Sequence, residues 1–516
     1  MIVAFSRRLR RSATSSNLPS LFATTTTPSS TAGIIIALAR GGISLLLRTA
    51  LLWRVVELIV QERYLRPRRV TTSHLAEGGR LPSALSGYAV VTPLSMTTDA
   101  TAADVTAATA TAVPIGVHSL RYARRGTTAT AASANDDDDD DDDLDEKERR
   151  ARRRHYDGIS LHHGFGASSL SWLPILPRLV ERYGRYAVAH DAPGFGFTDR
   201  PDGDACGGMG LYAYGSENSA GIGLALLREG LDSGLGGRGG ASEDEASSTG
   251  GVVDDAYDAI GSGGGGGGAS TTTTTRSIAI FGHSMGSRAA LFAALKCSSD
   301  LDLCMRPELV VLVAPALAGL TLPSRARRRY SRRGSRDVAP SGRRDGRRRM
   351  GGIVRRIWLT WRRAFVDRPL RYGLRRLVCG SRDFWRKGLT LAWGDPSRLS
   401  DSDVLRFQWP SIGVGWEGGL INFSKSRILS YPTPRDSLEF MDDGRLFEEV
   451  ARLNNTRIVI IYGSRDRVVR IDDGAANELR RKFPNVAVIK MEGCGHDPFE
   501  EDVSAFMSAL EEALEG

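Results

Sequence analysis

The feature that most constrains this chain is a short apolar run that leads directly into a serine flanked by glycines. Residues 277–281 read SIAIF, the pentapeptide GHSMG follows at 282–286, and residues 287–295 are rich in alanine. A strand, a sharp turn and a helix in this order match the pattern G-x-S-x-G, in which a strained turn lifts a serine hydroxyl above the edge of a sheet. An ordinary tight turn is the alternative. The context favours Ser284 as a nucleophile in an α/β fold.

Short apolar runs of the kind that form buried parallel strands recur through the C-terminal three quarters of the chain. Helical patterns lie between them, and the clearest covers residues 499–514, where Val503, Phe506 and Leu510 share one stripe. This alternation predicts a doubly wound, mostly parallel sheet. The expected strands are 115–122, 159–162, 187–190, 278–281, 309–313, 458–462 and 486–491.

The N-terminal part has a different composition. Residues 1–32 are rich in Ser, Thr and Arg and contain no acid, which is typical of a plastid or mitochondrial targeting peptide, with a disordered basic tail as the alternative. Residues 33–69 predict an amphipathic, membrane-associated helix, because charged side chains interrupt the apolar run on one half of the circumference. A clean span is less favoured, since arginine is costly in the bilayer. Residues 70–112 are a low-complexity linker, and the globular domain is expected over 113–516.

Three low-complexity segments interrupt that domain, at about 126–154, 234–275 and 324–349. Charge blocks and glycine tracts stay solvated, so we expect disordered inserts there. The net charge of +9 is concentrated in such blocks, and no basic–aromatic pattern or module predicts nucleic-acid binding. The 5 cysteines are irregularly spaced without a CxxC pair. They indicate reduced thiols, no zinc site and a chain that is not secreted.

Two further residues complete a candidate catalytic set. His496 follows the last predicted strand in a glycine-rich loop, so it is the best placed of the 8 histidines to act as general base for Ser284. Asp466 comes just after the strand at 458–462, at the carboxyl edge of the sheet, where it can orient the base. Asp472 and Asp473 are the alternatives, although both are more typical of a solvated helix start.

From about residue 113 onward the chain resembles the α/β-hydrolase superfamily. The resemblance rests on HGFGAS (163–168), DAPGFGFTD (191–199), GHSMG (282–286), GSRD (463–466) and GCGH (493–496), which occur in the family's order. It implies a single-domain serine hydrolase with a helical cap over about 316–455. It also implies that the backbone amides of Phe165 and Met285 form the oxyanion hole, that the histidine of the HG motif is structural, and that Asp191 anchors its own loop.

The cap region contains most of the tryptophans, which favours an apolar substrate, although they could equally pack the cap against the core. Trp393, Trp409 and Trp416 are the candidate pocket residues. We expect hydrolysis of an ester-type bond, lipid esters included, by a monomer without metal or organic cofactor. A membrane surface is a further candidate partner. An acyltransferase, a C–C bond hydrolase and a non-catalytic interaction protein on the same fold remain alternatives.

Overall fold

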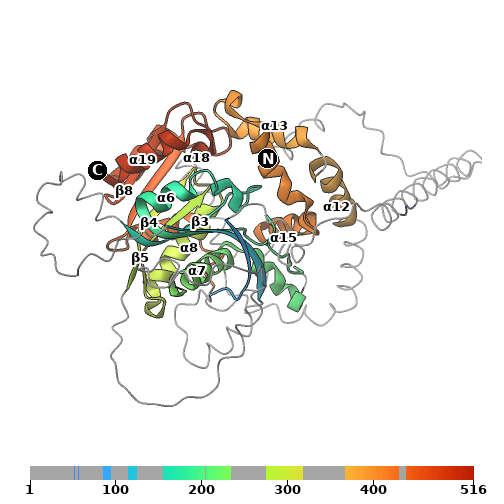
Figure 1. Ribbon diagram of the computed structural model, residues 1–516, viewed down its shortest axis with the longest axis horizontal. Coiled ribbons are helices and arrows are strands. Elements are labelled where there is room, and N and C mark those ends of the chain that lie inside the picture. The colour runs from blue at the N-terminus through green and yellow to red at the C-terminus, as the bar shows by residue number, and fades with distance from the viewer. Residues whose placement is uncertain are drawn as a thin grey trace, which may run out of the picture.

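The computed structural model describes residues 85–94, 114–124, 155–233 except 204, 275–317, 367–428 except 380, and 437–515, together with the isolated positions 52 and 56. These residues form one eight-stranded sheet with helices on both faces (Figure 1). The predicted α/β class is therefore confirmed. The targeting peptide, the amphipathic helix and the three inserts lie outside the described residues, apart from positions 52, 56 and 275.

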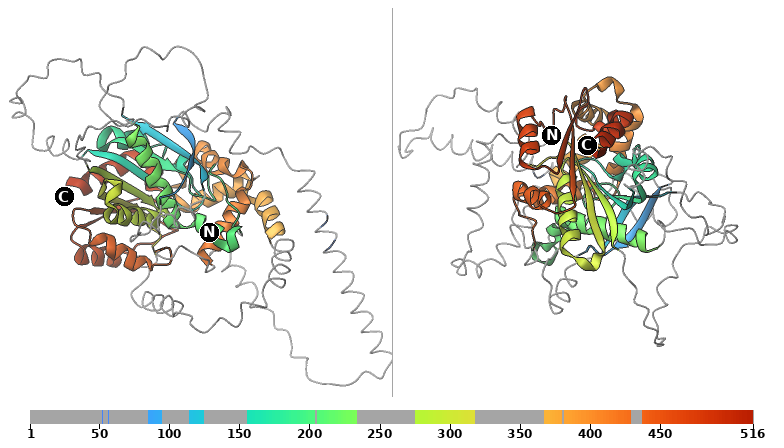
Figure 2. Two further views of the ribbon diagram at one scale, coloured as in Figure 1. Left: turned by 90° about the horizontal axis from the view of Figure 1, so that it is seen from below. Right: turned by 90° about the vertical axis from the view of Figure 1, so that its left-hand side faces the viewer.

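The strand order in the sheet is β1-β2-β4-β3-β5-β6-β7-β8. β3 and β4 are therefore exchanged relative to their order in the sequence. β2 is antiparallel to both neighbours and the remaining pairs from β4 to β8 are parallel. In Figure 2 the blue strands β1 and β2 lie at one end of the twisted sheet. The strands are β1 (Ser86–Val91), β2 (Ile115–Ala123), β3 (Tyr156–His162), β4 (Gly184–His190), β5 (Arg276–His283), β6 (Met305–Val313), β7 (Arg457–Gly463) and β8 (Val486–Met491).

Each face of the sheet buries its own apolar core. One core packs under α7 (Ser216–Asp232), α8 (Gly286–Ser299), α16 (Asp443–Ala451) and α17 (Asp473–Lys482). The other packs under α6 (Leu176–Tyr183), α18 (Pro498–Glu501) and α19 (Val503–Glu515). Because β5, β6 and β7 are covered on both sides, their sequences are continuous apolar runs rather than alternating ones.

The helices of the cap lie between β6 and β7 and appear in orange at one side of the sheet (Figure 1). They build a separate apolar cluster that includes Trp385, Trp393 and Phe407. The cap consists of α12 (Arg368–Leu374), a π-helical turn η8 (Arg375–Cys379), α13 (Arg382–Ala392), η9 (Pro396–Arg398), α14 (Asp401–Gln408), η10 (Trp409–Ile412) and α15 (Trp416–Ile428). Short 3-10 helices outside the cap are η2 (Ser169–Trp172), η3 (Ala205–Tyr214) and η5 (Leu301–Leu303).

Three sequence-based boundaries are wrong. β1 lies inside the expected linker 70–112 and pairs with β2 from Ser86 opposite Leu120, so the sheet begins well before residue 113. The expected helix 499–514 is two helices, because Asp502 accepts a hydrogen bond from Ala505 N at 2.9 Å and starts a new one. The cap was expected to reach residue 455, whereas α16 already packs against α8 in the core.

One ion pair ties α7 to β5 across the chain between them. Oδ1 of Asp232, the last residue of α7, lies 2.6 Å from a guanidinium nitrogen of Arg276, the first residue of β5. The two ends of the intervening segment therefore lie side by side at the amino end of β5, opposite the end that carries Ser284. Among the described residues, no helix is both long enough and apolar enough to cross a membrane.

Candidate active site

Ser284 occupies a strained turn between β5 and α8. Its φ angle is +51°, a left-handed conformation that costs a non-glycine residue about 1–2 kcal/mol. Two hydrogen bonds to the end of β6 hold it there: Ser284 N donates to Val313 O at 2.8 Å, and Ala316 N donates to Ser284 O at 3.0 Å. The neighbouring strand therefore fixes the conformation that places the hydroxyl at the carboxyl edge of the sheet.

The two glycines of the turn are required sterically. A Cβ at Gly286 would lie 2.4 Å from His162 O, and a Cβ at Gly282 would lie 2.6 Å from Ser287 Cα. Both atoms belong to the backbone and cannot move aside. The close approach of β5, α8 and the end of β3 thus depends on the absence of these side chains, as the motif predicts.

The structure brings the three predicted side chains together. His496 Nε2 lies 2.9 Å from Ser284 Oγ, and His496 Nδ1 lies 2.7 Å from Asp466 Oδ2. The other carboxylate oxygen of Asp466 accepts hydrogen bonds from the amides of Val468 and Val469, at 2.7 and 2.8 Å. Both carboxylate oxygens of Asp466 therefore have partners, which fixes the orientation of the carboxylate toward the imidazole.

The alternative acids have other partners. Asp472 caps α17 by accepting a hydrogen bond from Ala475 N at 2.7 Å, so its interpretation as a helix start is confirmed. Asp473 lies 3.2 Å from the ammonium of Lys490. Of the three candidate acids, Asp466 is the one that contacts His496.

The electrostatic surroundings make His496 a stronger base. Burial alone would lower its pKa, but the hydrogen bond to Asp466 and the negative charges of Asp497, Asp466 and Glu501 outweigh it, so the pKa of His496 is raised. Asp497 follows His496 directly and is itself buried, which raises its pKa to about 6. Sequence reasoning missed Asp497, whose only signal was an acid adjacent to the candidate base.

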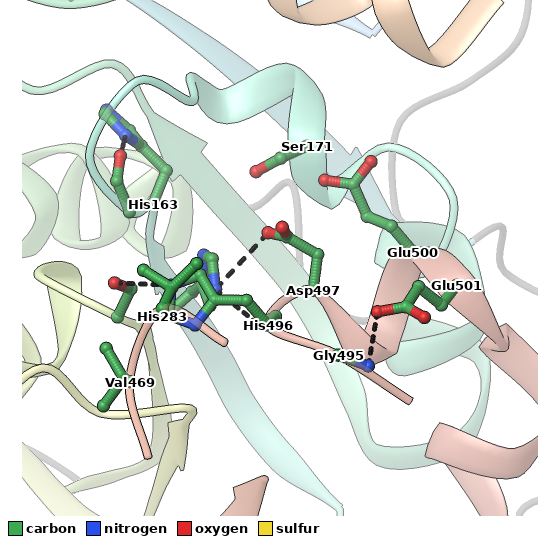
Figure 3. Close-up of polar contacts among 12 residues, drawn as sticks. His163, Ser171, His283, Val469, Gly495, His496, Asp497, Glu500 and Glu501 are labelled. Carbon is green, nitrogen blue, oxygen red and sulfur yellow. Dashed lines mark hydrogen bonds and ion pairs between the residues drawn. The ribbon is translucent and has the colours of Figure 1, made fainter. Parts of the chain in front are cut away.

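The histidine loop packs tightly against the end of β7 and against the cap. A Cβ at Gly463 would lie 2.1 Å from Gly495 O, so the glycine that ends β7 lets the loop approach Asp466. His496 N donates to Ala392 O at 2.6 Å, at the last residue of α13. Figure 3 shows His496 and Gly495 beside the short helix that carries Glu500 and Glu501.

His163 has a structural position in the loop after β3. Its Nδ1 donates to Gly164 O at 2.8 Å while its Nε2 accepts from Ala192 N at 3.0 Å, which sets the tautomer of the ring. Burial lowers the pKa of this imidazole, so it is neutral. His163 thereby joins the HGFG loop to the DAPGFG loop, in agreement with the role expected from the sequence.

Asp191 anchors the second of these loops, as expected. Its carboxylate accepts hydrogen bonds from Phe197 N at 2.7 Å and Ser169 N at 2.6 Å, and contacts Nδ1 of the buried His118 at 2.8 Å. Burial alone would raise the pKa of Asp191, but the charge and hydrogen bond of His118 hold it far below its usual range. The carboxylate of Asp191 therefore connects its own loop to the start of η2.

The two residues expected to form the oxyanion hole, Phe165 and Met285, adjoin the turn that carries Ser284. Met285 is the N-cap of α8, directly after Ser284, and Gly164 lies so close to the turn that a Cβ on it would be 3.1 Å from Ser284 Cβ. Within the described part of the chain, neither the Phe165 amide nor the Met285 amide donates a hydrogen bond. Both are available to a developing negative charge, and their assignment stays a prediction.

An aromatic cluster lies beside these residues. The Phe165 side chain is 40% exposed and packs on the rings of Phe195 and Phe423, with centroids 5.6 and 5.9 Å away. Met285 packs against the same cluster. Sequence reasoning missed Phe195 and Phe423; the first stands within the DAPGFGFTD string, and the second lies on α15 without a local signal.

The three candidate tryptophans have different surroundings. Trp393 is 1% exposed and packs on Phe407 at 6.1 Å, and Trp416 is also buried, so both contribute to the interior of the cap. Trp409 is 40% exposed and its ring packs on Phe197 at 5.9 Å. Contact of these three residues with a substrate stays a prediction.

Comparison with known proteins identifies the family. Residues 161–509 match the alpha/beta hydrolase family, which is more than half of the chain, so the protein belongs to that family. Cfl2 from Burkholderia cenocepacia is similar in fold, at 16% identity and a TM-score of 0.41, over 77% of this chain and 92% of that one. A bromoperoxidase from Bacillus anthracis is similar at 15% identity and a TM-score of 0.41, over 78% and 97%.

A meta-cleavage product hydrolase from Pseudomonas fluorescens (CumD) is similar at 15% identity and a TM-score of 0.39, over 77% of this chain and 94% of that one. At these identities the likeness concerns the fold alone. No curated protein matches the sequence significantly.

Proposed function

We propose that the protein is a serine hydrolase that cleaves an ester-type bond through an acyl-enzyme intermediate. One observation carries the proposal: a continuous hydrogen-bonded chain runs from Asp466 through His496 to Ser284, with contacts of 2.7 and 2.9 Å. A serine hydroxyl becomes nucleophilic when a neighbouring base takes its proton, and the base needs an acceptor that stabilises its charged form.

In the proposed mechanism, His496 Nε2 takes the proton of Ser284 as Oγ attacks the carbonyl carbon of the ester. The amides of Phe165 and Met285 stabilise the negative oxygen of the tetrahedral intermediate. The imidazolium, held by Asp466, then gives its proton to the departing alcohol, which leaves an acyl group on Oγ. Water attacks the acyl-enzyme with the same base, releases the acid and restores the serine.

The proposed substrate carries an apolar acyl group. Phe165 has an exposed ring next to one of the two amides that would hold the oxyanion, and the buried rings of Phe195 and Phe423 pack against it. Apolar acyl chains lose water on such a surface, which favours their binding over that of charged acids. Simple fatty-acyl and lipid esters belong to the class that this surface suits.

Labelling with a fluorophosphonate probe tests the nucleophile. We expect the wild-type protein to be labelled on Ser284 and S284A to lose both labelling and ester hydrolysis, by about 10⁴-fold or more in kcat. The substitution removes one oxygen and leaves the turn intact, so the melting temperature serves as the control for folding. Labelling that persists in S284A would contradict the proposal.

Products distinguish hydrolysis from acyl transfer, which the same side chains could also support. p-Nitrophenyl esters of increasing acyl length, assayed with and without an added alcohol, report the preferred chain and the acceptor. We expect free acid as the main product in both conditions, with longer acyl chains preferred over acetate. Transfer of most acyl groups to the alcohol would identify an acyltransferase instead.

A further inference from the structure

A buried glutamate bridges the histidine loop and the cap without touching Ser284. Glu501 ends α18, and its side chain is almost fully enclosed. Oε1 accepts a hydrogen bond from Gly495 N at 2.6 Å, and Oε2 accepts one from Gly394 N at 2.8 Å. Figure 3 shows the contact between Glu501 and Gly495, the residue directly before His496. One carboxylate therefore fixes two amides that are 101 positions apart in the chain.

The two bridged segments lie directly against each other. A Cβ at Gly394 would lie 2.3 Å from Gly493 O, and a Cβ at Gly495 would lie 2.1 Å from Ala392 O. Backbone packs on backbone here, with no side chain to absorb a displacement. The hydrogen bond from His496 N to Ala392 O, at 2.6 Å, adds a direct connection. A shift at the end of α13 must therefore be transmitted to the loop that carries the imidazole.

Residues on either side of Glu501 also bind the cap. Glu500 contacts the guanidinium of Arg406 of α14. Asp502 lies 3.0 Å from Arg398, in the short helix between α13 and α14. Three consecutive acids thus connect to three separate points of the cap. Of these, Glu501 is the one that also holds the histidine loop.

We propose that Glu501 is a positioning residue that couples the base of the cap to His496, so that the position of the cap sets the position of the general base. The inference rests on the proposed function. In such an arrangement the binding energy of a substrate that settles the cap would be used to align the imidazole with Ser284. Misplacement of a reacting group by about 1 Å can cost on the order of 100-fold in rate.

Glu501 also contributes its negative charge to the surroundings of His496. The imidazole of His496 is faced by Asp466 from the end of β7, by Asp497 and Glu501 from α18, and by His283 from the end of β5. E501Q removes the charge and leaves a single acceptor oxygen for two amides. E501D keeps the charge, but its shorter side chain cannot reach both amides. The two variants therefore separate the electrostatic contribution from the positional one.

The experiment compares the wild type, E501Q and E501D with E512Q, an exposed glutamate on α19, as the matched control. kcat and KM for a p-nitrophenyl ester are measured across pH, together with hydrogen exchange of the backbone amides. We expect both Glu501 variants to lose about 10- to 100-fold in kcat with a smaller change in KM. The acid limb should move to lower pH in E501Q and stay in place in E501D. At least one of Gly394 and Gly495 should exchange faster in each variant, because neither replacement can accept from both amides.

Wild-type kcat, acid limb and exchange in E501Q would overturn the inference. If neither Glu501 variant folds, exchange in the wild type decides, because amides that donate to a buried carboxylate must be protected. Exchange of Gly394 or Gly495 at the rate of an unfolded chain would contradict the bridge. A wild-type protein that a fluorophosphonate fails to label would refute the proposed function and this inference with it. Normal wild-type labelling with unchanged Glu501 variants would refute the inference alone.

Discussion

Nε2 of His283 donates a hydrogen bond to the backbone oxygen of His496 across 3.0 Å. The residue before the candidate nucleophile thus holds the main chain of the candidate base. Asp497 Oδ1 lies 3.4 Å from the same nitrogen, and the ring packs edge-on against Phe499. Burial lowers the pKa of His283 far below its usual value, so the ring is neutral with its proton on Nε2. The nucleophile turn and the histidine loop are therefore one connected unit.

Replacing His283 should weaken this connection in a graded way. In H283Q the amide nitrogen can still donate to His496 O, whereas H283F fills the space and cannot donate. We expect H283F to lose about tenfold or more in kcat/KM and H283Q to lose clearly less. Rates of ester hydrolysis and of fluorophosphonate labelling measure the difference. Equal activity of the two variants would show that the hydrogen bond is not needed.

The choice between the acids after β7 can be tested with a pair of variants. D466N should keep the local geometry but lose the acceptor that sets the tautomer of His496, with a decrease of about 10⁴-fold in kcat. D472A should keep the wild-type kcat. It should lose about 1 kcal/mol of unfolding free energy, because it removes the N-cap of α17. Steady-state kinetics and urea denaturation measure the two effects. A large kcat loss in D472A would reverse the assignment.

The pH dependence of kcat/KM should reflect the acids around His496. The base must be neutral to accept a proton. Because the pKa of His496 is raised, activity should fall on acidification already above the ordinary value of 6.5. Removing a nearby negative charge lowers that pKa, so D497N should shift the acid limb to lower pH. A pH–rate profile of both proteins checks the direction. A shift to higher pH in D497N would contradict the electrostatic account.

Glu217 should make the fold less stable as the pH rises. Burial in α7 raises its pKa to about 7, although it accepts hydrogen bonds from Ser437 Oγ and Leu438 N. The unfolded chain ionises near the ordinary value of 4.5, so the contribution to stability is full below that pH and is lost as the pH rises to about 7. E217Q cannot ionise and should show a flatter profile over this window. Urea midpoints at several pH values, with E512Q as the control, measure it.

The sequence predicts the elements that have a local apolar pattern and misses those that depend on long-range contacts. β5, β6 and β7 are buried on both faces and are visible as apolar runs. β1 was missed because its SGYAVV sequence is mostly half-buried at the edge of the sheet. Its Tyr88 bonds to Asp199, 111 positions away, a contact that no local pattern reveals. The break between α18 and α19 likewise depends on a single capping residue, Asp502, inside an otherwise continuous apolar stripe.

The candidate site divides in the same way. Ser284, Asp466 and His496 each come shortly after a strand, so the parallel sheet brings them to one edge and the sequence indicates them. Asp497 contacts His283 at the end of β5, and Glu501 accepts a hydrogen bond from Gly394 of the cap, so both depend on segments far apart in the sequence. Their importance is therefore tertiary in origin.

The pair between Asp232 and Arg276 has a practical consequence for engineering the protein. The side chains of Asp232 and Arg276 are 2.6 Å apart at the end of β5 opposite Ser284, so a domain could be inserted between them. A folded reporter whose own termini are adjacent could replace residues 234–274 without separating α7 from β5. We expect such a chimaera to keep wild-type fluorophosphonate labelling, which a gel assay would show. The protein would then carry a second domain at the edge of the sheet opposite the candidate active site.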